Sequence, residues 1–226
     1  MQHISLRLEK IAGLVDCNAR VADIGADHGY LSIFLEKEKQ TPQIIACDIN
    51  EKPLSVARKN IEKMGCTKIE LRLSDGFEKI KKNEIDTAVI AGMGGEVISG
   101  IIERCEWIKS DKYTLILQPM TSSQELRRYL YSNKFEIVAE AAVFDSDKLY
   151  TVIKAVYSGV SRPYRDGDCY IGKLSPENET DYKYLKKQLN IITDCCESLK
   201  GVLGKSEEYL YYKSIAKELK NFLGED

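Results

Sequence analysis

Short apolar runs alternate with helical segments across the first two thirds of this 226-residue chain, and this alternation constrains the fold more than any other feature. Strands that alternate with helices need crossover connections, which make the strands parallel and cover both faces of the sheet. The sequence therefore predicts a doubly wound α/β fold. The predicted strands are residues 20–24, 43–48, 68–73, 86–91 and 113–118, and the predicted helices are residues 30–37, 53–64, 95–106 and 122–132.

The alternation of strands and helices changes after residue 134. Residues 135–143 and 149–157 are two strand-like runs separated only by FDSDK, which predicts an antiparallel hairpin at the end of the sheet. At the other end of the chain, residues 5–15 have helical spacing, with Ser5 as the predicted cap.

Residues 159–226 differ in composition from the rest. A loop-rich connector leads to two long helical patterns, residues 180–199 and 207–222, separated by Gly201 and Gly204. Apolar residues recur at three- and four-residue steps in both, which predicts an antiparallel helical pair resembling a short coiled coil. We therefore expect two domains, 1–158 and 159–226.

Composition limits the classes of protein to consider. No uncharged apolar run approaches the roughly 20 residues that cross a bilayer, and the N-terminus has no export-signal pattern, so we expect a cytoplasmic protein without membrane contact. Seven cysteines without a CxxC pair and only two histidines argue against a metal site. The net charge of −2 divides evenly between the two predicted domains, so RNA would have to bind local basic clusters. The oligomeric state is open, with a monomer favoured.

The segment ARVADIGADHGYLSIFL, residues 19–35, carries the sharpest functional signal. A strand ends at Asp23, turns through Gly25 and Gly29, and enters a helix whose N-terminus can face a ligand. The spacing of these glycines departs from the GxGxxG of dinucleotide sites, which disfavours a nicotinamide enzyme.

Two further acidic positions follow later strands. Asp48 ends the second strand, where a carboxylate can accept hydrogen bonds from both ribose hydroxyls of a nucleoside. Asp75 and Gly76 follow the third strand, where an acid can bind an adenine amino group beside a position with room for the ring. Strand ends of this kind line the ligand crevice of open α/β sheets.

The fourth strand leads into VIAGMGGEVI, residues 89–98. Enzymes that methylate exocyclic amines often have Asn/Asp-Pro-Pro-aromatic at this place. This chain lacks that motif, which argues against methylation of an exocyclic amine by that route. A ring nitrogen already has a lone pair, so as an acceptor it needs positioning more than deprotonation. The glycines here leave room for a flat base.

ADIGADHGYL, DTAVIAGMGG, LILQPM and the opening SLRLEKIA resemble the bacterial tRNA (adenine-22-N1)-methyltransferase family, over residues 4–157. The resemblance implies a class I methyltransferase sheet, S-adenosylmethionine as cofactor, tRNA as partner, and methyl transfer to N1 of an adenine in the D-arm. Asp27 would be the acidic residue nearest the chemistry. By motif position, the cofactor would contact Asp23, Gly25, His28, Gly29, Asp48, Ile49, Asp75, Gly76, Ala91, Gly92 and Met93, and the substrate would contact Arg7, Gln118 and Pro119.

Structural roles are the alternatives at several of these positions. Asp27 could cap the following helix instead of contacting a base. His28 could form a local backbone hydrogen bond, and Pro119 could end the fifth strand. For the whole chain, the alternatives are a methyltransferase of the same fold acting on a small molecule or a protein, and a protein that binds S-adenosylmethionine without turnover.

Overall fold

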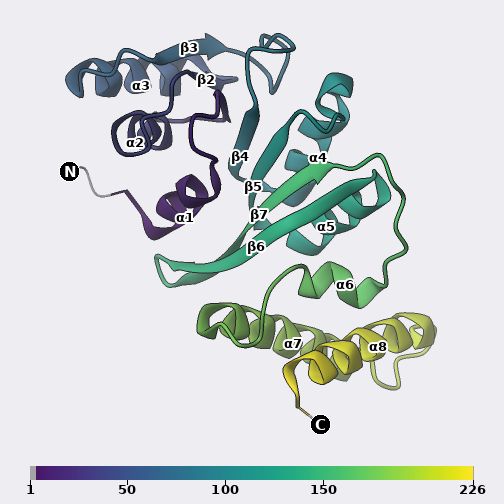
Figure 1. Ribbon diagram of the computed structural model, residues 1–226. Coiled ribbons are helices and arrows are strands. Elements are labelled where there is room, and N and C mark those ends of the chain that lie inside the picture. Colours follow the sequence, from purple (N-terminus) through teal and green to yellow (C-terminus); the bar gives the residue numbers. More distant parts are fainter. Residues whose placement is uncertain (1–3, 226) are drawn as a thin grey trace.

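Seven strands form one mixed sheet in the computed structural model, which describes residues 4–225 (Figure 1). The strand order is β3-β2-β1-β4-β5-β7-β6, parallel from β3 to β5 and antiparallel at the β7-β6 hairpin. The doubly wound fold and the terminal hairpin predicted from the sequence are thus confirmed. The strands are β1 (Val21–Ile24), β2 (Ile44–Asp48), β3 (Ile69–Leu73), β4 (Thr87–Gly94), β5 (Thr114–Thr121), β6 (Phe135–Asp145) and β7 (Lys148–Tyr157).

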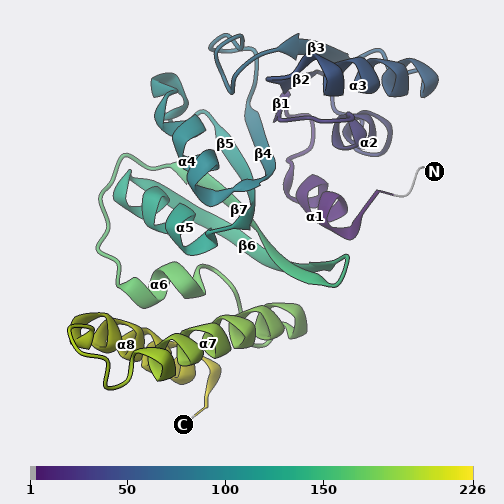
Figure 2. The same cartoon turned by 180° about the vertical axis from the view of Figure 1, so that it is seen from behind.

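Helices cover both faces of this sheet. Apolar residues of α1 and α2 pack on one face, those of α4 and α5 pack on the other, and α3 packs beside α2 (Figure 2). The central strands β1 and β2 are buried on both faces and are mostly Val, Ile and Ala up to their carboxyl ends, as is typical of parallel strands between helix layers. The helices of this part are α1 (Leu6–Leu14), α2 (Tyr30–Glu38), α3 (Glu51–Lys63), α4 (Gly95–Glu103) and α5 (Ser123–Ser132), with a 3₁₀ turn η1 (Glu106–Ile108).

A side-chain cap fixes the start of α1. Ser5 caps α1 as predicted, because its hydroxyl accepts a hydrogen bond from the backbone N–H of Leu8. The prediction that Pro119 ends the fifth strand was wrong, since β5 continues to Thr121. Pairing of β5 with β7 stops at Leu117, and on the other side Pro119 lies opposite Met93, where the register of β4 shifts. A proline lacks the ladder N–H, and irregular pairing of this kind tolerates it.

Three helices follow the hairpin and pack beneath it (Figure 1). The two long ones confirm the predicted antiparallel pair, and Asn178 caps the first of them through its side chain. The sequence predicted only a loop before them, but a six-residue helix forms there. These helices are α6 (Asp166–Ile171), α7 (Glu179–Leu199) and α8 (Ser206–Leu223).

A buried ion pair in the sheet part forms hydrogen bonds with the helical layer. Arg127 of α5 and Glu140 of β6 are 1% and 0% exposed, with the Arg127 Nη2 and Glu140 Oε1 atoms 2.6 Å apart. Arg127 also donates to the carbonyl of Cys169 in α6, and Glu140 accepts from the N–H of Lys173. The two parts therefore share a buried polar network, and the boundary near residue 158 stays a prediction.

No helix among residues 4–225 is long and apolar enough to cross a membrane.

Candidate functional site

The loop between β1 and α2 has a backbone that only a few residue types adopt easily. Gly25 and Gly29 have φ angles of +77° and +75°, and Asp27 between them has +50°. A Cβ on Gly25 would overlap the Cε of Met93, so the end of this flexible side chain would have to move for any larger residue at position 25. The glycine spacing seen in the sequence thus reflects a required conformation at both positions.

Asp23 lies at the carboxyl end of β1 and is buried. The Ser32 hydroxyl of α2 donates to its Oδ2 at 2.7 Å. Burial raises the pKa of Asp23 to about 6; the Ser32 hydrogen bonds oppose this rise, and the charge of Asp48 adds to it. A carboxylate in this position is suited to bind a cation that replaces its lost hydration.

A cavity of about 370 Å³ opens beside Asp23, at the carboxyl ends of β1 and β4. This is the position where open α/β sheets bind their ligands. The structure therefore brings together residues that the sequence places in four separate segments. The cavity is lined by Arg7, Leu8, Asp23, Gly25, Ala26, Asp27, His28, Tyr30, Leu31, Ala91, Gly92 and Met120.

The sequence did not single out Leu8, Ala26, Tyr30, Leu31 and Met120 of this lining. Sequence position could have identified two of them as cavity residues, because Met120 follows the end of a predicted strand and Tyr30 directly follows the glycine loop. Both are exposed apolar side chains beside a cavity. They are suited to contact a flat, partly apolar ligand.

Asp48 contacts the cavity loop from the neighbouring strand. Its Oδ2 accepts the N–H of Asp27 at 3.3 Å, and its Oδ1 accepts the N–H of Asn50 at 2.9 Å. Ile49 beside it is exposed. Asp48 thus links the ends of β1 and β2 and keeps lone pairs free for a further donor.

Asp75 lines a separate hollow of about 530 Å³, together with Phe77, Ile101 and Trp107, and the adjacent Gly76 lies against Ile101. The Asp75 Oδ1 accepts a hydrogen bond from Arg104 at 2.9 Å. The structure therefore does not place these two residues in the cavity that holds Asp23 and Asp27.

Asp27 is not a helix cap. The N-cap position of α2 belongs to Gly29, which has no side chain, and the Asp27 side chain is 68% exposed at the cavity. The predicted capping role was therefore wrong, because the loop continues for two residues beyond Asp27 before the helix begins. The left-handed backbone of Asp27 is one that Asp tolerates better than most residues.

The ring of His28 does not form the local backbone hydrogen bond expected as its structural role. Its Nδ1 has no hydrogen-bond partner among residues 4–225 and lies 3.7 Å from Asp27 Oδ1. The ring packs edge-on against Tyr30, and the side-chain amide of Asn60 donates a hydrogen bond to the backbone carbonyl of His28. The loop thus presents a carboxylate, an imidazole and a phenol side by side.

Gln118 is fully buried in β5 and contacts Gly92 of β4. Gly92 has a φ of +77° and lies where the register of β4 shifts, and we call this irregularity within the strand the Gly92 turn. The Gln118 Oε1 accepts hydrogen bonds from the Gly92 N–H at 3.1 Å and from Arg7 Nη1 at 2.6 Å. Its Nε2 donates to the carbonyl of Pro119. Of the three predicted substrate residues, only Arg7 lines the cavity.

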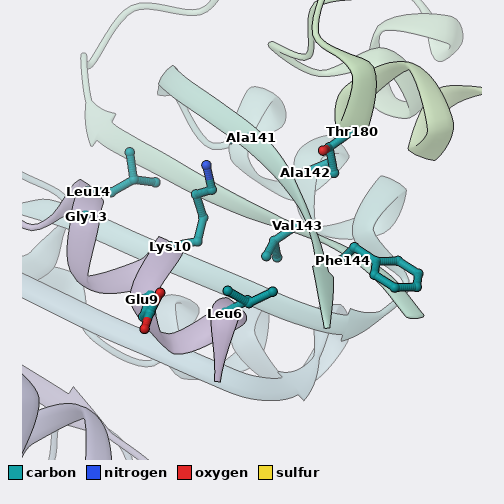
Figure 3. Close-up of a pocket in the computed structure, with 10 residues that line it drawn as sticks. All are labelled: Leu6, Glu9, Lys10, Gly13, Leu14, Ala141, Ala142, Val143, Phe144 and Thr180. Atoms are coloured by element: carbon teal, nitrogen blue, oxygen red, sulfur yellow. The ribbon is translucent and has the colours of Figure 1, made fainter. Parts of the chain in front are cut away.

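A larger hollow of about 590 Å³ lies elsewhere, between α1 and β6 (Figure 3). Leu6, Lys10 and Leu14 face Phe144 and Thr180 across it. It contains no predicted site residue and no strand-end carboxylate. No group of three His, Cys, Asp or Glu side chains suited to a metal ion occurs in the described part of the chain.

Comparisons with known proteins agree with this geometry. Residues 4–153 match the model of a methyltransferase domain family. The chain is 34% identical, over 166 residues that cover 70% of each protein, to the tRNA (adenine(22)-N(1))-methyltransferase of Bacillus subtilis strain 168.

Solved structures agree over nearly the whole chain. Streptococcus pneumoniae Sp1610 in complex with S-adenosyl-L-methionine superposes with a TM-score of 0.82 at 28% identity, covering 98% of this chain and 100% of the other. M. capricolum TrmK in complex with S-adenosyl-homocysteine gives 0.80 at 28% identity, covering 98% of each. The strand-end cavity, the domain match and the curated relative together show that this chain belongs to the tRNA (adenine(22)-N(1))-methyltransferase family.

Proposed function

We propose that this protein transfers a methyl group from S-adenosylmethionine to N1 of adenine 22 in the D-arm of tRNA. One observation carries the proposal: the cavity at the ends of β1 and β4 combines the buried Asp23, the Gly25 loop and the exposed Asp27 in a chain of this family.

The residues present fit S-adenosylmethionine. The buried Asp23 suits the ammonium of the amino-acid end, and Gly25 gives the loop that lines the cavity its positive φ. Asp48 accepts N–H donors at the next strand end and has lone pairs available for the ribose hydroxyls. Gly29, Ile49, Ala91 and Met93 stay predicted contacts of the same site. Asp75 and Gly76, which do not line this cavity, stay predicted adenine contacts.

When bound, S-adenosylmethionine supplies an electrophilic methyl group on a cationic sulfur. The adenine N1 lone pair would form the new bond to this carbon while the carbon–sulfur bond breaks and S-adenosylhomocysteine leaves as a neutral thioether, so the base would need no deprotonation beforehand and would become positively charged. The protein's task is therefore to align N1 and to stabilise the charge that develops on the base.

Asp27 is the residue that we assign to this charge. Its carboxylate is exposed at the cavity and is held by a loop whose backbone is tied to Asp48. His28 and Tyr30 beside it offer a hydrogen-bonding ring and an aromatic face. N1 lies on the pairing edge of adenine, so the base must leave its partner before reaction.

The decisive experiment incubates the protein with labelled S-adenosylmethionine and bulk tRNA from a strain that lacks this gene. Nucleoside mass spectrometry should find the label in 1-methyladenosine. A tRNA transcript with guanine in place of adenine 22 is the matched control and should take up no label.

The same assay separates the alternatives. A methyltransferase for a small molecule or a protein would label its product without tRNA. A protein that only binds S-adenosylmethionine would show a heat of binding in calorimetry and label no nucleoside. Label in a tRNA nucleoside other than 1-methyladenosine would show that the methyl group is transferred to a different atom.

A further inference from the structure

Arg7 of α1 lines the cavity, but its guanidinium already contacts three other side chains of the protein. Nη1 donates to Gln118 Oε1, Nε lies 3.6 Å from Asp145 Oδ2, and the group lies over the ring of Tyr150. Only 21% of the side chain is exposed. These contacts join α1, β5 and the β6–β7 hairpin at one point.

The acceptor in this arrangement is a buried amide with both ends engaged. Gln118 accepts from Arg7 and from the Gly92 N–H on one side and donates to the Pro119 carbonyl on the other, so the amide cannot flip without losing hydrogen bonds. The charged donor Arg7 holds the Gln118 carbonyl oxygen in position and so fixes the acceptor that the Gly92 N–H uses.

The second donor to Gln118 is part of the cavity wall. Gly92 has a φ of +77°, and both Gly92 and Ala91 line the cavity beside Asp23. Glycine has many accessible conformations, so a turn built on it needs outside contacts to hold one of them. The hydrogen bond to Gln118 supplies such a contact.

From this geometry we propose that Arg7 is a positioning residue. Through the buried Gln118 carbonyl it fixes the Gly92 turn, which forms one wall of the cavity, and it does not act by binding tRNA phosphate. The inference rests on the proposed methyl transfer for its kinetic test, and its structural test is independent of activity.

The structural test follows the Gly92 amide by NMR. Glycine labelled with ¹⁵N and alanine labelled with ¹³C at the carbonyl leave only Ala-Gly pairs visible, and the chain has two, at Gly13 and Gly92. Arg7→Met, which keeps an apolar stem over Tyr150, should move the Gly92 signal to the upfield proton shift of a weaker hydrogen bond. Gln118→Met should do the same.

Arg20→Met is the matched control. Arg20 pairs with Asp86 at the opposite end of the same sheet, with Nη2 and Oδ1 2.6 Å apart. Its loss removes an arginine ion pair without touching the cavity, so the Gly92 signal should stay in place. An unmoved Gly92 signal in Arg7→Met would overturn the proposal.

The kinetic test separates positioning from RNA binding. Arg7→Met should lower kcat about 10- to 100-fold with the KM for tRNA nearly unchanged, since misplacement of the wall affects alignment. Arg7→Lys should restore part of the rate, and the double variant with Gln118→Met should be no slower than the slower single variant. A raised KM with unchanged kcat, and a salt dependence of tRNA binding reduced by about one phosphate contact, would instead make Arg7 a tRNA ligand.

Failure of the proposed function gives a different result. If the wild-type protein labels no tRNA, the Gly92 shift and the calorimetric affinity for S-adenosylhomocysteine still decide the role of Arg7. A Gly92 shift together with at least tenfold weaker binding in Arg7→Met, but not in Arg20→Met, would support it. Unchanged binding would count against it.

Discussion

At the scale of single residues, Asp27 tests whether a charge at the cavity contributes to methyl transfer. Asp27→Asn keeps a side chain that tolerates the left-handed backbone and removes only the charge. We expect kcat to fall at least 100-fold, about 2.7 kcal/mol of transition-state stabilisation, with the calorimetric affinity for S-adenosylhomocysteine nearly unchanged. A variant with wild-type turnover would remove Asp27 from the mechanism.

Asp23 should make the stability of the ligand-free protein depend on pH. Its pKa is about 6 in the folded protein against an ordinary 3.8, so its protonated form is favoured by folding. That contribution is complete below pH 3.8 and is lost as the pH rises through about 6, which leaves an ionised buried group that costs up to about 3 kcal/mol. Asp23→Asn should therefore stabilise the ligand-free protein at pH 8 and have little effect at pH 3.5, as measured by urea unfolding.

The same carboxylate should give ligand binding a pH dependence. If Asp23 binds the ammonium of S-adenosylhomocysteine, its ionised form is required, and affinity should increase as the pH rises from 5 to 7. Asp23→Asn should bind more weakly and lose this dependence in calorimetry. A wild-type affinity that is constant over this range would place the ammonium elsewhere.

At the scale of elements, the sequence predicts the sheet well because its signals are local. Five parallel strands follow from apolar runs of strand length, and their boundaries differ from the observed ones by one residue at the start and by at most three at the end. Helix α6 was missed because its six residues include Gly167 and two aspartates, and a hydrogen bond from Arg127 holds it in place. Such contacts lie more than forty residues apart in sequence.

The site residues also fall into two groups, those that the sequence pattern predicts and those that only packing brings together. The strand-end positions of Asp23 and Asp48 follow from the α/β rhythm, whereas the pairing of Arg7 with Gln118 depends on how α1 packs. The Gly25–Met93 approach and the partition of Asp75 into a second hollow are also products of packing. Spacing in a single sequence carries no information on these contacts.

The packing of α4 against the start of α5 offers an element-scale prediction. A Cβ on Gly95, the first residue of α4, would overlap the carbonyl oxygen of Ser122, and backbone cannot move aside as a flexible side chain can. Gly95→Ala should therefore destabilise the protein by roughly 1–3 kcal/mol in urea unfolding. Gly13→Ala in α1 is the matched control, because nothing lies within 4 Å of its added Cβ. It should be neutral or stabilising by up to about 1 kcal/mol, as alanine is in helices.

At the scale of the whole molecule, the C-terminal helices and the hairpin form one packed layer. Ala142 of β6 belongs to the apolar core of α7 and α8, and Tyr131 of α5 and Leu149 of β7 pack against it. Asp181 of α7 accepts the N–H of Ala142 and that of Ser175. Residues 159–225 therefore depend on the sheet domain for part of their core, and removing them would expose apolar surface on the hairpin.

Arg127 should decide whether this layer stays in place. Arg127→Met leaves Glu140 buried without its partner and removes the hydrogen bond to the Cys169 carbonyl, which should cost about 3–5 kcal/mol. Arg128→Met is the control on the same helix: Arg128 also reaches α6 through Asp166, but it is partly exposed, so its loss should cost at most about 1 kcal/mol.

Hydrogen exchange in Arg127→Met should accelerate in α6 and the first turns of α7, while β1, β2 and β4 keep their protection. Binding of S-adenosylhomocysteine should persist, because the cavity lies at the ends of β1 and β4, whereas Glu140 lies in the edge strand β6. Uniformly faster exchange throughout the chain would show instead that the helices and the sheet unfold as one cooperative unit.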